Sequence, residues 1–379
     1  MKKIIFSFLI LFISYIIYNI LTYSEYLKKV KEIGIENKKC SKIGYKYPIE
    51  DFVKINESII IGSSFDVPHL FLDLIYLTET NIPNGQMVLL DLNTNIITEL
   101  PIKNFPEKIP FHPHGIDLYK DEYIYIINHS FNYYGSNERI EVIKIEKNPI
   151  SLTFIKGYIL PKNFLGTLNS ICAISDETIY FTTSNPFPMP NSNLQNSFFY
   201  KYRYKFGNVI SVLFNWKNTG MYSYNKGKIK FIKETSGFLN NGITFIPEKK
   251  LLYIAQTIDK RFLVLKIGKN ETNPQLVKIV KSDYAYDNLF YDKSKGIIYA
   301  GIIGRLMDYI GLTEHYKKYG NINYKGYYGG YEEIDTNNND KIKVIHMSKD
   351  KLKGISSGMT IGKKQVLSAS IEDGFLICE

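Results

Sequence analysis

The sequence has no arginine-rich stripe. Its 47 lysine and arginine residues exceed its 37 acidic residues by ten, a modest net charge of +10 for 379 residues. The lysines are scattered along the chain, and only the segment 28–39 gathers several of them. A nucleic-acid-binding surface needs clustered basic side chains, so this distribution indicates a solvated lysine surface and argues against a nucleic-acid partner.

Helical patterns are also scarce. Alanine is infrequent, and beyond residue 40 no long segment repeats its apolar residues with the 3.6-residue period of a helix. Aromatic residues are abundant instead, with 31 tyrosines and 23 phenylalanines. Aromatic and β-branched side chains suit half-buried strands, so we expect an all-β fold.

The N-terminus lacks a small-residue cleavage site after its hydrophobic run. Lys2 and Lys3 precede the run 4–21, which only serine and asparagine interrupt. A run of this length is near the lower limit of a membrane-spanning helix and longer than most signal-peptide cores. We interpret residues 1–24 as an uncleaved signal anchor, with a cleaved signal peptide as the alternative. Both interpretations place residues 25–379 in the endoplasmic reticulum lumen, at the cell surface or in the secreted fraction.

There are only three cysteines. Cys40 follows the hydrophobic run, Cys378 is next to the last residue, and Cys172 lies within an apolar strand-like segment. A bridge between Cys40 and Cys378 would tie the two ends of the chain together, which an oxidising compartment permits. Cys172 is then most simply a small buried hydrophobic residue.

Glycosylation sequons fit the same compartment. They occur at three positions: Asn56, Asn128 and Asn270. Asn128 is too close to the end of a strand-like run to be a convincing acceptor. Asn270 lies between two such runs, so we expect it to be the glycosylated residue.

One pattern recurs six times. A polar pair opens a short apolar strand, a charged or glycine-containing turn follows, and a second apolar strand returns. The copies are residues 50–64, 114–129, 169–184, 241–257, 287–302 and 357–371. Their starts are about 46 to 72 residues apart, near the length of a four-stranded propeller blade. We therefore predict a six-bladed β-propeller with a central tunnel, completed by the last strand, 373–379; an open sandwich or two β domains is the alternative.

The polar residues that open these strands would meet at one end of the tunnel. Oxygen-bearing side chains recur there: Glu50, Asn169, Asn241, Asp287 and Asn288. Two carboxylates and three amide oxygens form an oxygen-only cage, which suits calcium. A single Asn or Asp before a strand is commonly a turn residue, but recurrence at matching positions favours a metal site.

Histidines cluster in the same region. The chain has six, and three of them, His112, His114 and His129, surround one predicted hairpin. His114 opens the inner strand of that hairpin and His129 ends its partner strand, so we expect the two to be neighbours. An imidazole pair beside a metal is suited to proton transfer near neutral pH, whereas His112 is interpreted as a loop residue.

These stretches resemble the paraoxonase/arylesterase family, calcium-dependent six-bladed propellers with an uncleaved N-terminal hydrophobic segment. The matching segments span residues 40–379: IEDFVKINESIIIGSS, PHGIDLY, IINH, LNSICAI, NNGITFIPEKKLLYIA, YDNLFYDKSKGIIYAG and LICE. The resemblance implies that the five oxygen-bearing residues named above hold a catalytic calcium. It also implies that His114 and His129 are the histidine dyad and that Cys40 and Cys378 form the closing disulfide.

The sequence departs from the family at several positions. The resemblance implies a second, structural calcium held by Asp51 and the carbonyl of Ile116, but Ser170 replaces a further carboxylate of that site, which puts the second ion in doubt. An Asp-His pair of the family appears here as residues 185–186, Asn-Pro, and its free cysteine corresponds to Ile302. The aromatic segment 186–216 would cover the tunnel mouth, with an outer strand pair as the alternative for its FFYKYRYKF portion.

The resemblance implies hydrolysis of aryl esters or lactones, with calcium polarising the carbonyl and the histidine dyad activating water. The other hypothesis is a catalytically weak, membrane-anchored chaperone or assembly factor for membrane proteins such as ion channels, as some paraoxonase-like membrane proteins are. The anchor and Ser170 leave room for this alternative. The complete set of catalytic-calcium residues favours the hydrolase.

Overall fold

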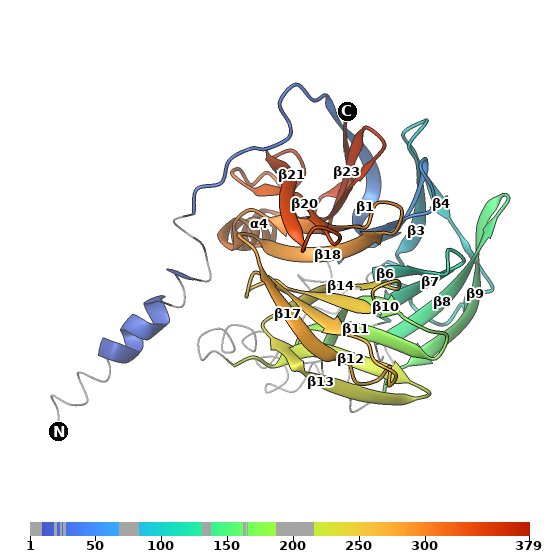
Figure 1. Ribbon diagram of the computed structural model, residues 1–379. Helices are drawn as coiled ribbons and strands as arrows, with labels where there is room; N and C mark the ends of the chain where they lie inside the picture. Colours follow the sequence, from blue (N-terminus) through green and yellow to red (C-terminus); the bar gives the residue numbers. More distant parts are fainter. Residues whose placement is uncertain are drawn as a thin grey trace.

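The computed structural model describes residues 10–18, 21–22, 25, 28–67, 83–130, 138–161, 164, 166–186 and 216–379. Beyond Cys40, this part of the chain consists mainly of antiparallel strands, together with the helix α4 (Leu306–Tyr319). Figure 1 shows the sheets arranged around a common centre, with β6, β10, β14 and β18 nearest to it. The predicted all-β propeller is thus confirmed.

Four of the sheets are separate blades. Each is built around an antiparallel meander whose first strand lies innermost, and β5 adds to one of them in parallel. Their strands are β5 (Ile102–Lys103), β6 (Pro113–Tyr119), β7 (Tyr123–Asn128), β8 (Arg139–Lys147) and β9 (Ile150–Ile159); β10 (Thr167–Ala173), β11 (Thr178–Asn185), β12 (Thr219–Asn225) and β13 (Lys228–Gly237); β14 (Asn240–Ile246), β15 (Leu251–Gln256), β16 (Arg261–Lys266) and β17 (Gln275–Lys281); β18 (Ala285–Asp292), β19 (Ile297–Ile303), β20 (Tyr328–Asp335) and β21 (Lys341–Lys349).

The remaining strands form one seven-stranded sheet in the order β22-β23-β24-β1-β2-β3-β4. They are β1 (Cys40–Lys54), β2 (Ile59–Ser64), β3 (Gln86–Asp91), β4 (Ile96–Leu100), β22 (Ile355–Ile361), β23 (Lys364–Ala369) and β24 (Asp373–Cys378). Strand β1 joins the two parts, because its beginning pairs with β24 and its end pairs with β2.

The prediction of six separate blades is wrong, because seven of the strands form this one sheet. All six hairpins recognised in the sequence form, as β1-β2, β6-β7, β10-β11, β14-β15, β18-β19 and β22-β23. The first and last of them share a continuous sheet, because β1 is a single 15-residue strand. The described chain therefore has four separate blades and one larger sheet.

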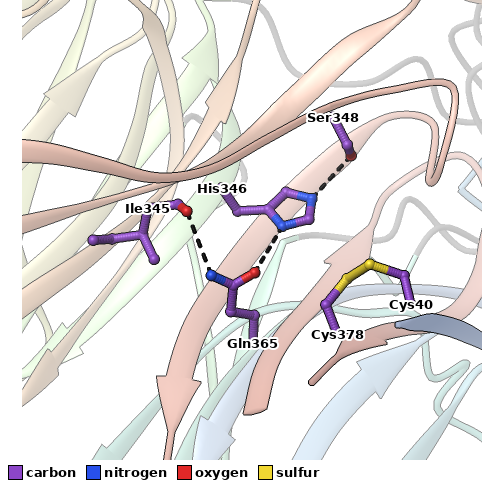
Figure 2. Close-up of a disulfide and its surroundings, with 6 residues drawn as sticks. All are labelled: Cys40, Ile345, His346, Ser348, Gln365 and Cys378. Atoms are coloured by element: carbon purple, nitrogen blue, oxygen red, sulfur yellow. Dashed lines mark hydrogen bonds between the residues drawn. A yellow bond between two sulfur atoms is a disulfide. The ribbon is translucent and has the colours of Figure 1, made fainter. Parts of the chain in front are cut away.

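The two ends of the propeller chain meet at a disulfide. Cys40 and Cys378 face each other across the β1-β24 pair, with Cα atoms 4.0 Å apart, and are bridged as predicted. Figure 2 shows His346 near this bridge, held between Gln365 and Ser348 at 3.0 and 2.9 Å. Cys172 is buried and unbridged, as expected.

The anchor predicted over residues 1–24 lies partly outside the described residues, which here are 10–18 and 21–22. Residues 10–18 are helical, but in the described part of the chain no helix is long and apolar enough to cross a membrane.

Apolar side chains fill the spaces between neighbouring sheets. Val53 and Ile61 of the large sheet, for example, pack in one cluster with Ile116 and Ile124 of the next blade. The inner strands approach so closely that a Cβ atom on Gly115 would lie 2.3 Å from the backbone oxygen of Asn169. Glycine after His114 therefore lets two strands meet at the axis.

We expect the disulfide to contribute substantially to stability. Replacing Cys40 and Cys378 by serine should lower the free energy of unfolding by about 3–5 kcal/mol, because a bridge spanning 338 residues restricts the unfolded chain. Chemical denaturation monitored by circular dichroism measures the change. Cys172→Ala is the control: it keeps the bridge, so a reductant should lower its free energy of unfolding by the same amount as that of the wild type. An unchanged transition in the double-serine variant would show that closure does not depend on the bridge.

Candidate active site

The residues that open the inner strands lie where strand pairing is interrupted. The register of each inner hairpin shifts at or beside the polar pair, between Ile49 and Asp51 in β1-β2 and between Asn240 and Ile243 in β14-β15. The other four hairpins shift at the corresponding position. Such irregularities redirect side chains out of the ladder. Here they place polar side chains of different blades around one cavity.

Hydroxyl groups satisfy backbone oxygens that lie at these interruptions. Ser63 donates to the carbonyl of His114 at 2.6 Å, and Thr182 donates to the carbonyl of Asn241 at 2.6 Å. In both cases the hydroxyl comes from the preceding hairpin. Because an unsatisfied buried carbonyl is costly, these bonds hold the interruptions in place and connect neighbouring blades.

The cavity has a volume of about 180 Å³. Four of the predicted calcium residues line it together with both predicted catalytic histidines: Glu50, Asn169, Asn241, Asp287, His114 and His129. Phe65, Leu306 and Tyr309 supply apolar and aromatic walls, the last two from α4. The sequence-predicted residues are thus brought together, although they lie far apart along the chain.

Several oxygens at this position have no hydrogen-bond partner. They are Glu50 Oε2, Asn169 Oδ1, Asn241 Oδ1 and Asn288 Oδ1, each fully buried. Asn288 turns its amide nitrogen towards Glu50, donating to the Oε1 atom at 2.9 Å and to the carbonyl at 3.1 Å. Buried acceptors without a donor are unfavourable, so this group of oxygens is suited to a hard cation.

Burial raises the pKa of both carboxyl groups of the cage. Burial raises the pKa of Glu50 well above its usual range, and the charges of Asp51 and Asp287 add to that effect. Burial likewise raises the pKa of Asp287 to about 7, although a hydrogen bond from Asn241 opposes the shift. A bound cation would favour the ionised forms instead.

The cage differs from sites built on histidine and carboxylate alone. Among the described residues, no group of three or more His, Cys, Asp or Glu side chains is arranged to hold a metal. Three of the five cage residues are asparagines, and amide oxygens are ordinary calcium ligands. The donor set therefore fits calcium better than zinc.

At the second predicted calcium position, the side-chain oxygens accept hydrogen bonds from within the protein. Asp51 Oδ2 accepts a hydrogen bond from the backbone N–H of Ile116 at 3.0 Å, and Oδ1 accepts from Phe52 N–H at 2.9 Å and Ser357 Oγ at 3.0 Å. Ser170 Oγ accepts from the N–H of Ile243 at 3.4 Å. Both oxygens of Asp51 thus accept hydrogen bonds within the protein, and the second ion stays a prediction.

His114 and His129 lie side by side. Their ring centres are 4.8 Å apart, and Phe65 packs against both rings at 6.0 and 6.3 Å. His114 Nε2 is 3.4 Å from Glu50 Oε1 and 3.4 Å from the amide nitrogen of Asn169, while its Nδ1 has no partner. Burial, together with His129, lowers the pKa of His114 well below its usual range, so its imidazole is neutral and able to accept a proton.

Two further residues support this pair. Glu138, which the sequence interpretation missed, lies 2.8 Å from His129 Nδ1 through its Oε2 atom. Burial lowers the pKa of His129 to about 3. His112 lies in a loop just before β6, as predicted, but it is buried: its Nδ1 lies 2.7 Å from the carbonyl of His129, and its own carbonyl accepts from the N–H of His129 at 3.1 Å.

Two of the glycosylation sequons and the aromatic segment were also predicted from the sequence. Asn270 is exposed in the turn between β16 and β17, where its side chain accepts hydrogen bonds from Thr272, and its glycosylation stays a prediction. Asn128 is fully buried and donates to Glu141, so it is not accessible. Most of the aromatic segment predicted over the tunnel mouth, residues 187–215, lies outside the described residues.

The raised pKa of Asp287 predicts a pH effect in the presence of a chelator. Because the folded-state pKa of about 7 exceeds the ordinary value near 4, ionisation destabilises the folded protein as pH rises from about 4 to 7. Asp287→Asn removes the charge, so it should match the wild type near pH 4 and become more stable by a few kcal/mol near pH 7. Urea denaturation across this pH range measures the difference. A difference that stays constant with pH would contradict the assignment, and added calcium should reverse the order at pH 7.

Comparison with known proteins gives a consistent result. Residues 72–308 match the family model described as arylesterase. Serum paraoxonase/arylesterase 2 of Bos taurus is 30% identical over 224 residues, which cover 57% of this chain and 56% of that protein. Serum paraoxonase/lactonase 3 of Homo sapiens is 27% identical over 224 residues, with coverage of 57% and 56%. The chain thus spans somewhat more than half the length of these relatives.

Solved structures share the fold at low sequence identity. A gluconolactonase from Xanthomonas campestris is 9% identical with a TM-score of 0.51, covering 91% of each chain. A luciferin-regenerating enzyme is 9% identical with a TM-score of 0.50, covering 90% of this chain and 95% of that one. These likenesses concern the fold alone. The family-model match extends over more than half of the sequence, and the chain therefore belongs to the paraoxonase/arylesterase family.

Proposed function

We propose that this protein is a calcium-dependent hydrolase of aryl esters or lactones. The observation that carries the proposal is a group of unpartnered buried oxygens, on Glu50, Asn169 and Asn241, which line one cavity together with a neutral histidine pair. The names of the relatives, arylesterase and lactonase, support the reaction class. Family membership and site chemistry thus point to the same kind of carbonyl chemistry.

The cage residues would hold one calcium ion: Glu50, Asn169, Asn241, Asp287 and Asn288. Calcium bound there would polarise the substrate carbonyl and stabilise the negative charge that develops on its oxygen. The proposal is limited to one ion, because both side-chain oxygens of Asp51 at the second position accept hydrogen bonds within the protein.

The chain's own residues supply the proton transfer. His114 is neutral through burial, and its unpartnered Nδ1 can accept the proton of an attacking water. His129 lies next to it and orients its ring or receives the proton in turn. Phe65, Leu306 and Tyr309 keep bulk water from the cavity and offer an apolar surface to the organic part of an ester or lactone.

The site and the relatives favour the hydrolase over the membrane-protein assembly factor. The relatives carry enzyme names, and the residues suited to cation binding and proton transfer are all present. We also infer a secreted location or one within the secretory pathway. The disulfide Cys40–Cys378 requires an oxidising compartment, and the matching relatives are named as serum proteins.

The first test of the proposal is calcium dependence. The protein should hydrolyse phenyl acetate or a simple lactone, lose this activity in a chelator and regain it with calcium. It should also unfold at a lower temperature in the chelator, because a ligand that binds the folded state stabilises it. A folded protein that binds calcium and turns over neither an aryl acetate nor any of a panel of lactones would contradict the hydrolase assignment.

His114 is the residue to change first. His114→Gln should lower kcat by about 100-fold or more, because general-base catalysis contributes roughly 10²–10⁴-fold. Its calcium content, measured by atomic emission, should stay the same. His315→Gln is the matched control, since His315 lies on α4 and contacts Asn321 rather than the cavity. Unchanged turnover in His114→Gln would remove this histidine from the mechanism.

A further inference from the structure

We propose that Glu25 is a positioning residue that holds the start of helix α4 against the turn 257–260 and thereby sets the shape of the cavity. Its effect on substrate selection rests on the proposed hydrolase function. Glu25 precedes the family-model match, which covers residues 72–308. The two segments that it joins both line the cavity, the turn through Thr257 and the helix through Leu306 and Tyr309.

The carboxylate of Glu25 reaches two distant parts of the chain. Its side chain is only 4% exposed. The Oε2 atom accepts a hydrogen bond from the backbone N–H of Leu306 at 3.3 Å, and the Oε1 atom lies 3.0 Å from Lys260 Nζ and 2.9 Å from Lys28 Nζ. One buried side chain thus connects positions that follow it by 235 and 281 residues.

Helix α4 has no side-chain cap of its own. Its N-cap residue is Arg305, which makes no capping hydrogen bond and pairs instead with Asp308 at 2.8 Å. The first N–H groups of a helix have no partner within the helix, and the positive end of the helix dipole favours a carboxylate. Glu25 supplies such an acceptor to Leu306 from outside the helix. The contact therefore determines where α4 begins relative to the sheets.

The turn 257–260 is fixed to the inner strands. Lys260 donates its backbone N–H to the carbonyl of Thr257 at 3.3 Å, and Thr257 Oγ1 donates to the carbonyl of Tyr286 in β18 at 2.7 Å. Glu25 is tied to this turn through Lys260 and to α4 through Leu306. It therefore sets the distance between two parts of the cavity wall.

The segment that follows Glu25 is attached to β21. Ile33 and Met347 exchange two backbone hydrogen bonds of 2.9 Å, and Glu32 Oε1 accepts from the N–H of Lys349 at 3.0 Å. Val30 and Ile33 also pack against a buried apolar cluster. Because these contacts already order the segment, little further conformational entropy is lost when Glu25 is held in place.

A role limited to neutralising lysines would not require this burial. The side chains of Lys28 and Lys260 are 21% and 30% exposed, so water can solvate both cations. Partly exposed ion pairs contribute little to stability. The contact with Leu306 is the one that reaches the cavity wall, and it explains why the carboxylate is buried at the start of α4.

The first test measures the helix directly and does not depend on turnover. In the full chain, Glu25→Ala should speed amide hydrogen exchange of a peptide covering residues 303–312 by about 10-fold, because the start of α4 loses its acceptor. Glu25→Gln keeps an oxygen for the N–H of Leu306 and should give an intermediate rate. Glu32→Ala is the matched control, since it removes a carboxylate that bonds a backbone N–H in the same segment but away from the cavity.

The second test measures the shape of the cavity through substrate size. Glu25→Ala should raise the ratio of kcat/KM for phenyl butyrate to that for phenyl acetate by about 5-fold, because a loosened wall admits a longer acyl chain. Calcium content should stay the same, and Glu32→Ala should keep the wild-type ratio.

Unchanged exchange at residues 303–312 in Glu25→Ala would overturn the positioning of α4 by Glu25. Faster exchange with an unchanged substrate ratio in an active enzyme would overturn its effect on the cavity. A wild type that hydrolyses neither ester, in which only Glu25→Ala speeds the exchange, would support the positioning of α4 and refute the hydrolase function.

Discussion

The site depends on the interruption of strand pairing at the axial end of each inner hairpin. A regular ladder would turn alternate side chains into the spaces between sheets, where the neighbours are apolar. The register shifts near Glu50, Asn169 and Asn241 direct these side chains to the axis instead. Ser63 and Thr182 make the shifts tolerable by donating to backbone oxygens of the following hairpin. The same hydroxyls join adjacent sheets, so the geometry of the site and the assembly of the ring are determined together.

Strand β1 adds a second connection between closure and chemistry. Its beginning pairs with β24 and carries the disulfide, while its end carries Glu50 and Asp51. The last hairpin contacts these residues directly, because Ser356 donates to the carbonyl of Glu50 and Ser357 to the carboxylate of Asp51. Opening the ring at the disulfide would therefore disturb the first cage residue. Strand β1 therefore takes part both in closing the ring of sheets and in positioning Glu50 at the site.

Much of this arrangement could be predicted from the sequence. The six hairpins and the convergence of the polar residues follow from local repeats and from residues that have no packing reason to open an apolar strand. The disulfide was indicated by the two cysteines near the ends of the chain and by the family resemblance. The larger sheet could not be predicted, because nothing in the repeat pattern shows that β1 continues from one hairpin to another. Glu138 was missed because its contact depends on the register of β7 and β8, which composition does not reveal. The burial of His112, which is a loop residue as predicted, was not foreseen, because its ring lies near Phe65 from another part of the chain.

Glu50 and Asp51 are both buried carboxyl groups, but their loss of hydration is compensated in different ways. Both carboxyl groups are buried at the axis, and burial raises the pKa of each, that of Asp51 to about 7. Asp51 is compensated within the protein, by two backbone N–H groups and the hydroxyl of Ser357. Glu50 Oε2 has no such compensation, and Glu50 lines the cavity with Asn169 and Asn241, whose side-chain oxygens also have no partner. The hydrogen bonds from Ile116 and Ser357 to Asp51 connect neighbouring hairpins at this inner position. The unfavourable charge and the unsatisfied acceptors are then concentrated at the cavity, where a cation can compensate both at once.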